Sequence, residues 1–136
     1  MNAIVLDTSI LIDYAHGHAD WIESLLLESE KNKLIIPTIA IAEYLTAQEA
    51  ETKDGYEKSK RFLDSFIKQE LTVEIAEVLG RLFRRKTYFP GASTGDLIIA
   101  ATALHLDVPL ATTNQRDFTR IPQLRFFDPK TLLKFR

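Results

Sequence analysis

The stretch A-I-V-L-D-T-S-I-L-I-D, at residues 3–13, decides how the rest of the sequence is interpreted. Its first four residues form a short apolar run that ends at Asp7, and a run of this length is typical of a buried β-strand. Further short apolar runs predict strands at residues 34–36, 110–112 and 124–127, with another strand or sheet edge at 69–73. The segments between them carry apolar residues at helical spacing. This alternation predicts an α/β fold, a single-domain parallel β-sheet flanked by helices on both faces.

The length and composition are those of one folded domain. The chain has 136 residues, of which 46% are hydrophobic and 26% charged, so we expect a single domain over residues 1–136. It contains no cysteine, which excludes a disulfide scaffold, a thiol nucleophile and a zinc–thiolate site. Residues 1–12 lack the basic segment of a secretory signal, and no apolar run is long enough to span a membrane. We therefore expect a cytoplasmic protein with no membrane contact.

The net charge of −2 argues at first against nucleic acid as a partner. The charges are unevenly distributed, however. Residues 1–50 carry 2 basic and 8 acidic side chains, whereas residues 51–136 carry 15 basic and 11 acidic ones. An acidic site that binds cations beside basic segments gives the same total, so the net charge does not exclude RNA.

Polar residues follow the predicted strands at the place where ligands bind in parallel sheets, outside the carboxyl ends of the strands. Asp7 follows the first strand, and Asn114 and Asp117 follow the run at 110–112. Glu43 lies among apolar neighbours in the helix after the second run, and Asp96 opens a strongly apolar helix. Carboxylates that converge at one edge repel one another, and the usual resolution is a hard divalent cation with oxygen ligands.

We therefore expect one or two Mg²⁺ or Mn²⁺ ions at this edge, which together can clamp a phosphodiester. The hydroxyls of Thr8 and Ser9 lie next to Asp7 in the sequence, where they can orient its carboxylate or a water on the ion. Each carboxylate also has a purely structural interpretation: Asp96 as a helix cap, Asp7 and Asp117 as turn residues, and Glu43 as an exposed helix residue.

Four sequence features in this order resemble the PIN domain: DTSILID at 7–13, an isolated Glu43, GDLIIAATA at 95–103 and LATTNQRDF at 110–118. The combination is similar to the VapC-type ribonuclease toxins of bacterial and archaeal toxin–antitoxin pairs. The resemblance covers nearly the whole chain. Its specificity lies in the combination and the order, since no single element is specific.

The resemblance implies a metal-dependent endoribonuclease with three or four carboxylates in one pocket. Asp7, Glu43 and Asp96 match the first three acids of the family and are the expected metal ligands. The fourth acidic position varies in the family. Here Asp117 is the expected occupant, whereas Asn114 stands where some members carry an aspartate.

The resemblance also implies a mechanism and partners. Thr8 and Thr113 match polar residues that line the pocket, and a water whose pKa the ion lowers attacks the phosphorus in line. The implied partners are RNA, a cognate antitoxin that holds the toxin inactive, and a second copy of the chain in a homodimer. We take the aromatic-rich helix at 56–66 as a candidate dimer surface.

Basic side chains near the acidic motifs are candidates for RNA binding. The segment RLFRRK and the residues after 115 supply them: Arg81, Arg84, Arg85, Lys86 and Arg116. Tyr88 and Phe89 follow this segment and are of a type that can stack on a base. The alternatives are a solvated helix face with pairs such as Glu77–Arg81, and core or dimer packing of the two aromatic residues.

Two other functions remain open at this stage. The first is a magnesium-dependent phosphohydrolase of small substrates, although the haloacid-dehalogenase pattern Asp-x-Asp is missing because the sequence reads Asp7-Thr8-Ser9. The second is a non-enzymatic α/β interaction module in which the acids are caps and turns. Loss of RNA cleavage on Asp7→Asn, with the fold intact, separates the nuclease from both alternatives.

Overall fold

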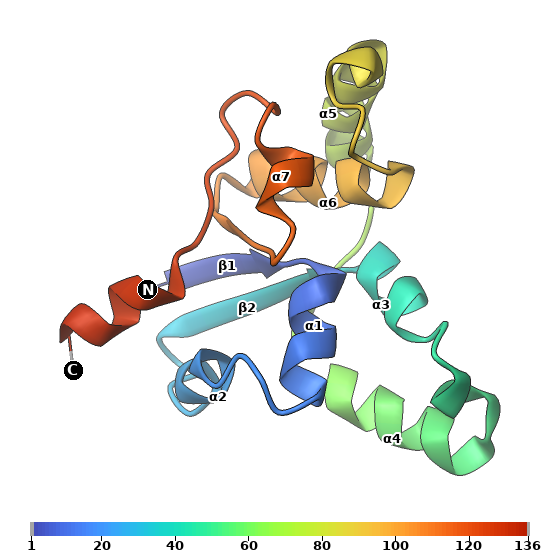
Figure 1. Cartoon of the computed structure of the whole chain (residues 1–136), viewed down its shortest axis with the longest axis vertical. Helices are drawn as coiled ribbons and strands as arrows, with labels where there is room; N and C mark the ends of the chain where they lie inside the picture. The colour runs from blue at the N-terminus through green and yellow to red at the C-terminus, as the bar shows by residue number, and fades with distance from the viewer. Residues whose placement is uncertain (1, 136) are drawn as a thin grey trace.

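The computed structural model describes residues 2–135 and contains a four-stranded parallel sheet between two layers of helices (Figure 1). The strands are β1 (Asn2–Leu6), β2 (Asn32–Pro37), β3 (Ile67–Gln69) and β4 (Leu110–Ala111). Their order in the sheet is β3-β2-β1-β4, and each neighbouring pair is parallel. The predicted α/β fold with a parallel sheet flanked by helices is therefore confirmed.

Two of the predicted strands differ from the structure. The strand expected at 69–73 lies earlier, as β3, and Val73 already begins a helix. The segment 124–127 forms no strand of its own in the described chain and contributes a single parallel bridge between Phe126 and Leu110. Leu110 also donates its backbone N–H to the carbonyl of Arg125 at 2.9 Å, so the segment still runs beside β4.

The helices cover both faces of the sheet. In chain order they are α1 (Thr8–Ala15), α2 (Trp21–Leu26), α3 (Thr38–Tyr44), α4 (Lys53–Leu63), α5 (Val73–Arg84), α6 (Thr94–Leu106) and α7 (Gln115–Phe118), with short 3₁₀ segments η1 (Gln48–Glu51), η2 (Lys86–Tyr88) and η3 (Pro129–Phe135). Figure 1 shows α5, α6 and α7 on one side of the sheet, α1, α2 and α4 on the other, and α3 beyond the carboxyl ends of the strands. Helix α1 was not predicted, because Thr8 and Ser9, which start it, were interpreted only as hydroxyls that orient Asp7 or a water on the ion.

The central strands are buried on both faces over residues 4–6 of β1 and 34–37 of β2, which explains why these segments are apolar. Along β1, Val5 belongs to the core beneath α5 and α6, whereas Ile4 and Leu6 belong to the core beneath α1 and α2. Successive side chains of a strand point to opposite faces, so a strand covered on both sides has no polar position. The continuous apolar run at residues 3–6 is the sequence signature of this arrangement.

The predicted dimer surface on the helix at 56–66 is wrong in part. Leu63 and Phe66 are buried in the core beneath α1. The ring of Phe62 packs against those of Tyr14 and Tyr44, with centroids 5.8 and 5.1 Å apart. These aromatic residues hold α4 on the domain and do not form a free surface. No helix of the described residues is long and apolar enough to cross a membrane.

Candidate active site

Asp7 lies at the carboxyl end of the central strand and begins helix α1. It is the N-cap of that helix, and its Oδ1 accepts a hydrogen bond from the Thr8 backbone N–H at 2.8 Å. Its Oδ2 accepts from the hydroxyls of Ser9 at 2.9 Å and Thr112 at 2.7 Å. Only 4% of Asp7 is exposed. The hydroxyl of Ser9 therefore contacts the Asp7 carboxylate directly, as its predicted role in orienting Asp7 requires.

Thr112 belongs to this network although the sequence did not single it out. In the sheet, Leu6 pairs with Ala111, and the Asp7 backbone N–H donates to the Ala111 carbonyl at 2.9 Å. Thr112 is consequently the partner of Asp7 just beyond the ends of β1 and β4. The predicted Thr113 is exposed, and its backbone N–H, at 3.2 Å from Ser9 Oγ, makes its contact to the network. Which of the two threonines contacts Asp7 depends on the register between β1 and β4, and the sequence alone does not show that register.

Glu43 connects the start of α1 to the start of α6. Its Oε1 accepts a hydrogen bond from Thr8 Oγ1 at 2.7 Å, although the two residues are 35 positions apart. Its Oε2 lies beside Gly95, where a Cβ would come within 2.9 Å of that oxygen. Glu43 is half-buried, so the interpretation as a freely exposed helix residue is not supported. The predicted Thr8 acts here as the donor that orients Glu43.

Asp96 is held in a capping box at the start of α6. Its Oδ2 accepts from the Ser93 backbone N–H at 2.9 Å, while the Asp96 N–H donates to Ser93 Oγ at 3.1 Å. The interpretation of Asp96 as a helix cap is therefore confirmed. Glu43, beside the adjacent Gly95, approaches the same first turn of the helix.

The charge of Asp7 is poorly compensated in this arrangement. Burial raises the pKa of its carboxyl above the usual 3.8, and the hydrogen bonds from Thr112 and Ser9 lower it only in part. The negative charge of Asp96 raises the pKa of Asp7 further, while the Thr8 N–H has a smaller lowering effect. A buried carboxylate beside a second negative charge favours either a proton or a cation.

Asn114 and Asp117 follow Thr112 in the chain, beyond its contact with Asp7. The Asn114 backbone N–H donates to Thr112 Oγ1 at 3.0 Å, so Asn114 adjoins the Asp7 network directly. Asp117 is one turn further along, in α7, and its Oδ1 comes within 2.9 Å of the position that a Cβ on Gly91 would take. Asp117 therefore lies in a short helix, whereas the alternative interpretation had placed it in a turn.

The oxygen donors at this edge suit a hydrated divalent cation. Among residues 2–135, no group of three carboxylate or histidine side chains is gathered closely enough to be a complete metal-binding cluster. Mg²⁺, however, is commonly bound through one or two carboxylates and keeps several of its waters. The buried Asp7, with Glu43 and Asp96 on neighbouring elements, provides oxygen donors of this kind.

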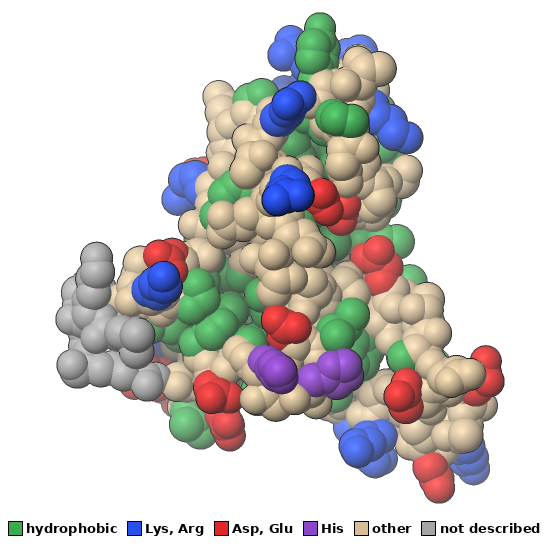
Figure 2. Space-filling view, in the orientation of Figure 1, with side chains coloured by type: hydrophobic (Ala, Val, Ile, Leu, Met, Phe, Trp, Pro, Cys, Tyr) green, Lys and Arg blue, Asp and Glu red, His purple; other side chains and the backbone are tan. Residues whose placement is uncertain are grey.

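The five predicted basic residues are all exposed but do not form one cluster. Arg81 and Arg84 line a shallow cavity on α5, whereas Arg85 lines a different cavity with Tyr88. Lys86 begins η2, and Arg116 lies in α7. No ion pair between Glu77 and Arg81 occurs in the described structure, where the two ion pairs are Lys68–Asp64 and Arg125–Asp107. Figure 2 shows Lys and Arg side chains around the end of the molecule formed by α5 and α7.

Comparison with known proteins places these features in a family. The family model of the PIN domain matches residues 4–124. Ribonuclease VapC19 of Mycobacterium tuberculosis is 30% identical over 130 residues, which cover 89% of this chain and 96% of that protein.

Solved structures agree with this result. VapBC2 from Rickettsia felis, crystallised with a DNA fragment from its promoter, is 26% identical with a TM-score of 0.72, covering 92% of this chain and 97% of that one. A toxin–antitoxin complex from Klebsiella pneumoniae is 28% identical with a TM-score of 0.69, covering 93% and 97%. The similarity in each case extends over nearly the full length of both chains.

Proposed function

This chain belongs to the PIN domain family, and from this premise we propose that it is an endoribonuclease that hydrolyses RNA phosphodiester bonds as the toxin of a type II toxin–antitoxin pair. The observation that carries the proposal is the buried Asp7 carboxylate at the carboxyl end of the central strand, close enough to Asp96 for its pKa to be raised by that charge. The similarity to a ribonuclease and to toxin–antitoxin complexes supports both the reaction and the biological role.

We propose that the ion is Mg²⁺ or Mn²⁺, bound as one or two ions by Asp7, Glu43 and Asp96 directly or through waters. Asp117 is the proposed fourth acid, with Asn114 as the alternative at that position. Such a cation, when bound, lowers the pKa of water and offsets the charge that develops on the phosphate.

The remaining residues of the site act by positioning. Ser9 and Thr112 donate to the same oxygen of Asp7 and fix the plane of its carboxylate. Thr8 fixes one oxygen of Glu43, and Ser93 fixes one oxygen of Asp96. Preorganised donors of this kind stabilise the negative side chains before any substrate arrives, so less reorganisation is needed during the reaction.

The proposed partners follow from the same assignment. RNA is the proposed substrate, and Arg81, Arg84, Arg85, Lys86 and Arg116 are proposed to contact its phosphates. A cognate antitoxin is proposed as the inhibitor, and a homodimer as the assembly of the toxin. We further propose that residues 1–136 act as one domain and that the protein works in the cytoplasm, where its RNA substrate is found.

Cleavage of total RNA by the purified chain, with Mg²⁺ or with EDTA, tests the proposal. We expect cleavage that requires the divalent ion and is abolished by Asp7→Asn without loss of the fold. The matched control is Asp20→Asn, because Asp20 is exposed and its side chain makes no capping hydrogen bond. Cleavage by Asp7→Asn at the wild-type rate, or hydrolysis of p-nitrophenyl phosphate but not of RNA, would contradict the proposal.

A further inference from the structure

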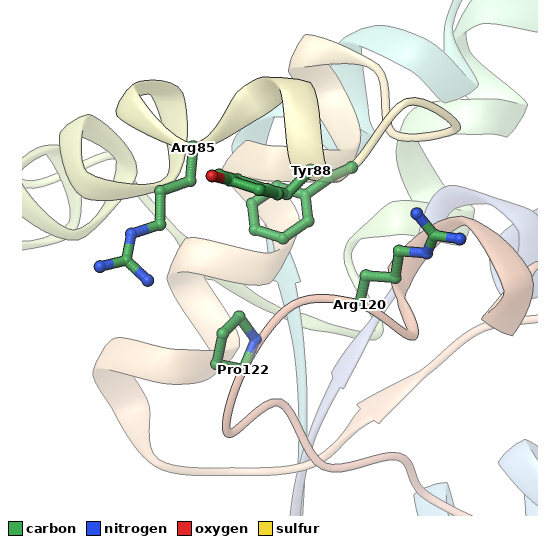
Figure 3. Close-up of a pocket in the computed structure, with 5 residues that line it drawn as sticks. Arg85, Tyr88, Arg120 and Pro122 are labelled. Atoms are coloured by element: carbon green, nitrogen blue, oxygen red, sulfur yellow. The ribbon is translucent and has the colours of Figure 1, made fainter.

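The cavity lined by Arg85 and Tyr88 lies between the end of α5 and the loop after α7. It has a volume of about 540 Å³ and is lined by Arg85, Tyr88, Phe89, Arg120 and Pro122 (Figure 3). We call it the Tyr88 cavity. Among the described residues, its lining consists of two aromatic rings, a proline and two cationic groups, without a carboxylate. Its volume falls within the range of roughly 300–1,000 Å³ that is usual for small-ligand sites.

The two aromatic residues of the Tyr88 cavity differ sharply in burial. Phe89 is 4% exposed and packs into the core beneath α5 and α6, whereas Tyr88 is 67% exposed. The backbone of Tyr88 is nevertheless held in place, because its N–H donates to the Arg85 carbonyl at 2.9 Å and the buried Phe89 anchors the next position. An exposed aromatic ring on an anchored backbone is suited to stacking against a flat, partly apolar group.

Two arginines flank this ring. Figure 3 shows Arg85 and Arg120 on opposite sides of Tyr88, with Pro122 across the cavity. Neither guanidinium takes part in an ion pair within the part of the chain that the structure describes. Two uncompensated positive charges at either side of an aromatic face favour a ligand that combines a flat ring with negative charge.

Both walls of the Tyr88 cavity continue into the region of the acidic site. Gly91 follows Phe89 by two positions and lies against the side chain of Asp117. On the other wall, Arg120 follows Asp117 by three positions, and the buried side chains of Phe118 and Ile121 anchor this segment to the core. The cavity is therefore next to the proposed fourth acid and not on a distant face.

We propose that the Tyr88 cavity binds one nucleotide of the single-stranded RNA substrate, with its base stacked on Tyr88 and its flanking phosphates between Arg85 and Arg120. This inference rests on the proposed ribonuclease function and adds a base-binding subsite to it. A nucleotide supplies both the flat ring and the anionic groups that the lining selects. An acidic protein segment satisfies the two arginines but leaves the exposed ring of Tyr88 without a matching surface.

Binding of two oligomers of equal length to cleavage-inactive protein tests the stacking. In the Asp7→Asn background with Mg²⁺ present, fluorescence anisotropy compares an oligoadenylate with an abasic ribose-phosphate oligomer. We expect Tyr88→Ala to weaken oligoadenylate binding about 5- to 150-fold, the effect of losing one stacked base, and to leave the abasic oligomer within about twofold. Tyr88→Phe keeps the ring and should bind both oligomers like the parent.

The arginines should behave differently from the tyrosine. Arg85→Ala and Arg120→Ala are expected to weaken both oligomers, and each should reduce the slope of log K against log salt by about 0.7, the value for one lost phosphate contact on a single strand. Matched controls lie on α4, where Tyr56 is 40% exposed and Arg61 is exposed. Tyr56→Ala and Arg61→Ala should leave binding of both oligomers unchanged.

The inference is overturned if Tyr88→Ala binds oligoadenylate as well as Tyr56→Ala does. It is also overturned if Tyr88→Ala keeps its RNA affinity and loses affinity for the antitoxin, because the cavity then belongs to a protein interface. Metal-dependent RNA cleavage by the wild-type chain is measured in parallel. If the wild type cleaves RNA and only the Tyr88 prediction fails, the base-binding subsite is wrong and the ribonuclease function stands. If the wild type neither binds nor cleaves RNA, both proposals are wrong.

Discussion

Replacement of Gly95 by alanine is expected to separate activity from stability at the proposed metal site. A Cβ at this position would lie 2.9 Å from Glu43 Oε2 and 3.4 Å from the carboxyl carbon. Nonbonded atoms of this kind prefer separations of about 3.5 Å, so the carboxylate must move by roughly 0.5 Å. The backbone of α6 has no need to move, because the carboxylate is the flexible end of a side chain. The variant therefore displaces one proposed ligand and leaves the fold in place.

The two expected effects have different magnitudes. Alanine favours a helix over glycine by up to about 1 kcal/mol, while weakening of the Thr8–Glu43 hydrogen bond opposes this by a similar amount. We therefore expect the free energy of unfolding to stay within about 1 kcal/mol of wild type. Misplacement of a catalytic group by 1 Å can cost about 100-fold in rate, so the expected loss of RNA cleavage is roughly 10-fold or more.

Urea unfolding and the initial rate of Mg²⁺-dependent RNA cleavage, measured on the same preparation, give the two quantities. The control is Gly80→Ala in α5, because a Cβ there would meet no atom within 4 Å. This control should gain stability by up to about 1 kcal/mol and keep its cleavage rate. Wild-type cleavage by Gly95→Ala would refute the reasoning, since the Glu43 carboxylate would then have no positional requirement.

The charges and hydrogen bonds around Asp7 and Asp96 lead to four more expected results. Burial raises the pKa of Asp7 above 3.8, so the folded protein holds this proton more tightly than the unfolded chain does. The free energy of unfolding of the metal-free protein should therefore fall as the pH rises from 3.8 through the raised pKa. Asp7→Asn removes this charge and should unfold at a higher urea concentration than wild type at neutral pH. Thr112→Val should lower the free energy of unfolding by about 1.5–3 kcal/mol, with recovery in Thr112→Ser, as measured by urea titration. Mg²⁺ at about 100 times its Kd should stabilise the wild type by about 2.7 kcal/mol in a thermal shift assay, and an equal shift in Asp7→Asn would argue against Asp7 as a ligand. Ser93→Ala should cost about 1 kcal/mol of stability and retain cleavage, whereas Asp96→Asn should lose cleavage; equal activity of the two variants would make Asp96 a cap alone.

The central strands were predictable because they are covered on both faces. A strand with buried neighbours above and below leaves a continuous apolar run, as Ile4, Val5 and Leu6 do in β1. The edge strand β3 has no such run, and its residue Ile67 is exposed, so composition alone placed it too late in the chain. A local sequence pattern therefore predicts a strand well where the strand is fully buried and poorly where it is partly exposed.

Helix α1 was missed for a different reason. It begins one residue after β1 ends, with Asp7 as its N-cap, so the same short motif carries both the end of a strand and the start of a helix. The apolar residues Ile10 and Leu11 are buried beneath the sheet and extend the apolar character of the strand into the helix. An apolar run cannot by itself show where one element ends and the next begins.

That the three carboxylates lie near one edge of the sheet was predictable, whereas the groups that orient them were only partly so, and their role as metal ligands stays a prediction. Asp7, Glu43 and Asp96 are polar residues inside apolar surroundings, and that contrast is visible in the sequence. Thr112 is one of two consecutive threonines, and its contact with Asp7 follows from the pairing of Leu6 with Ala111. The sheet register is a long-range property, since it joins segments more than 100 residues apart.

Capping and metal binding are compatible roles for these carboxylates. Asp7 caps α1 through Oδ1, and Asp96 caps α6 through Oδ2, so both negative charges lie at helix N-termini, where the backbone dipoles favour them. This placement makes two neighbouring anions tolerable in the folded chain and fixes their orientation. It does not compensate them fully, because the pKa of Asp7 is still raised by its burial and by Asp96. Under the proposed function, a divalent cation would offset the uncompensated part of the negative charge, so the capping role of these carboxylates is compatible with the proposed metal binding.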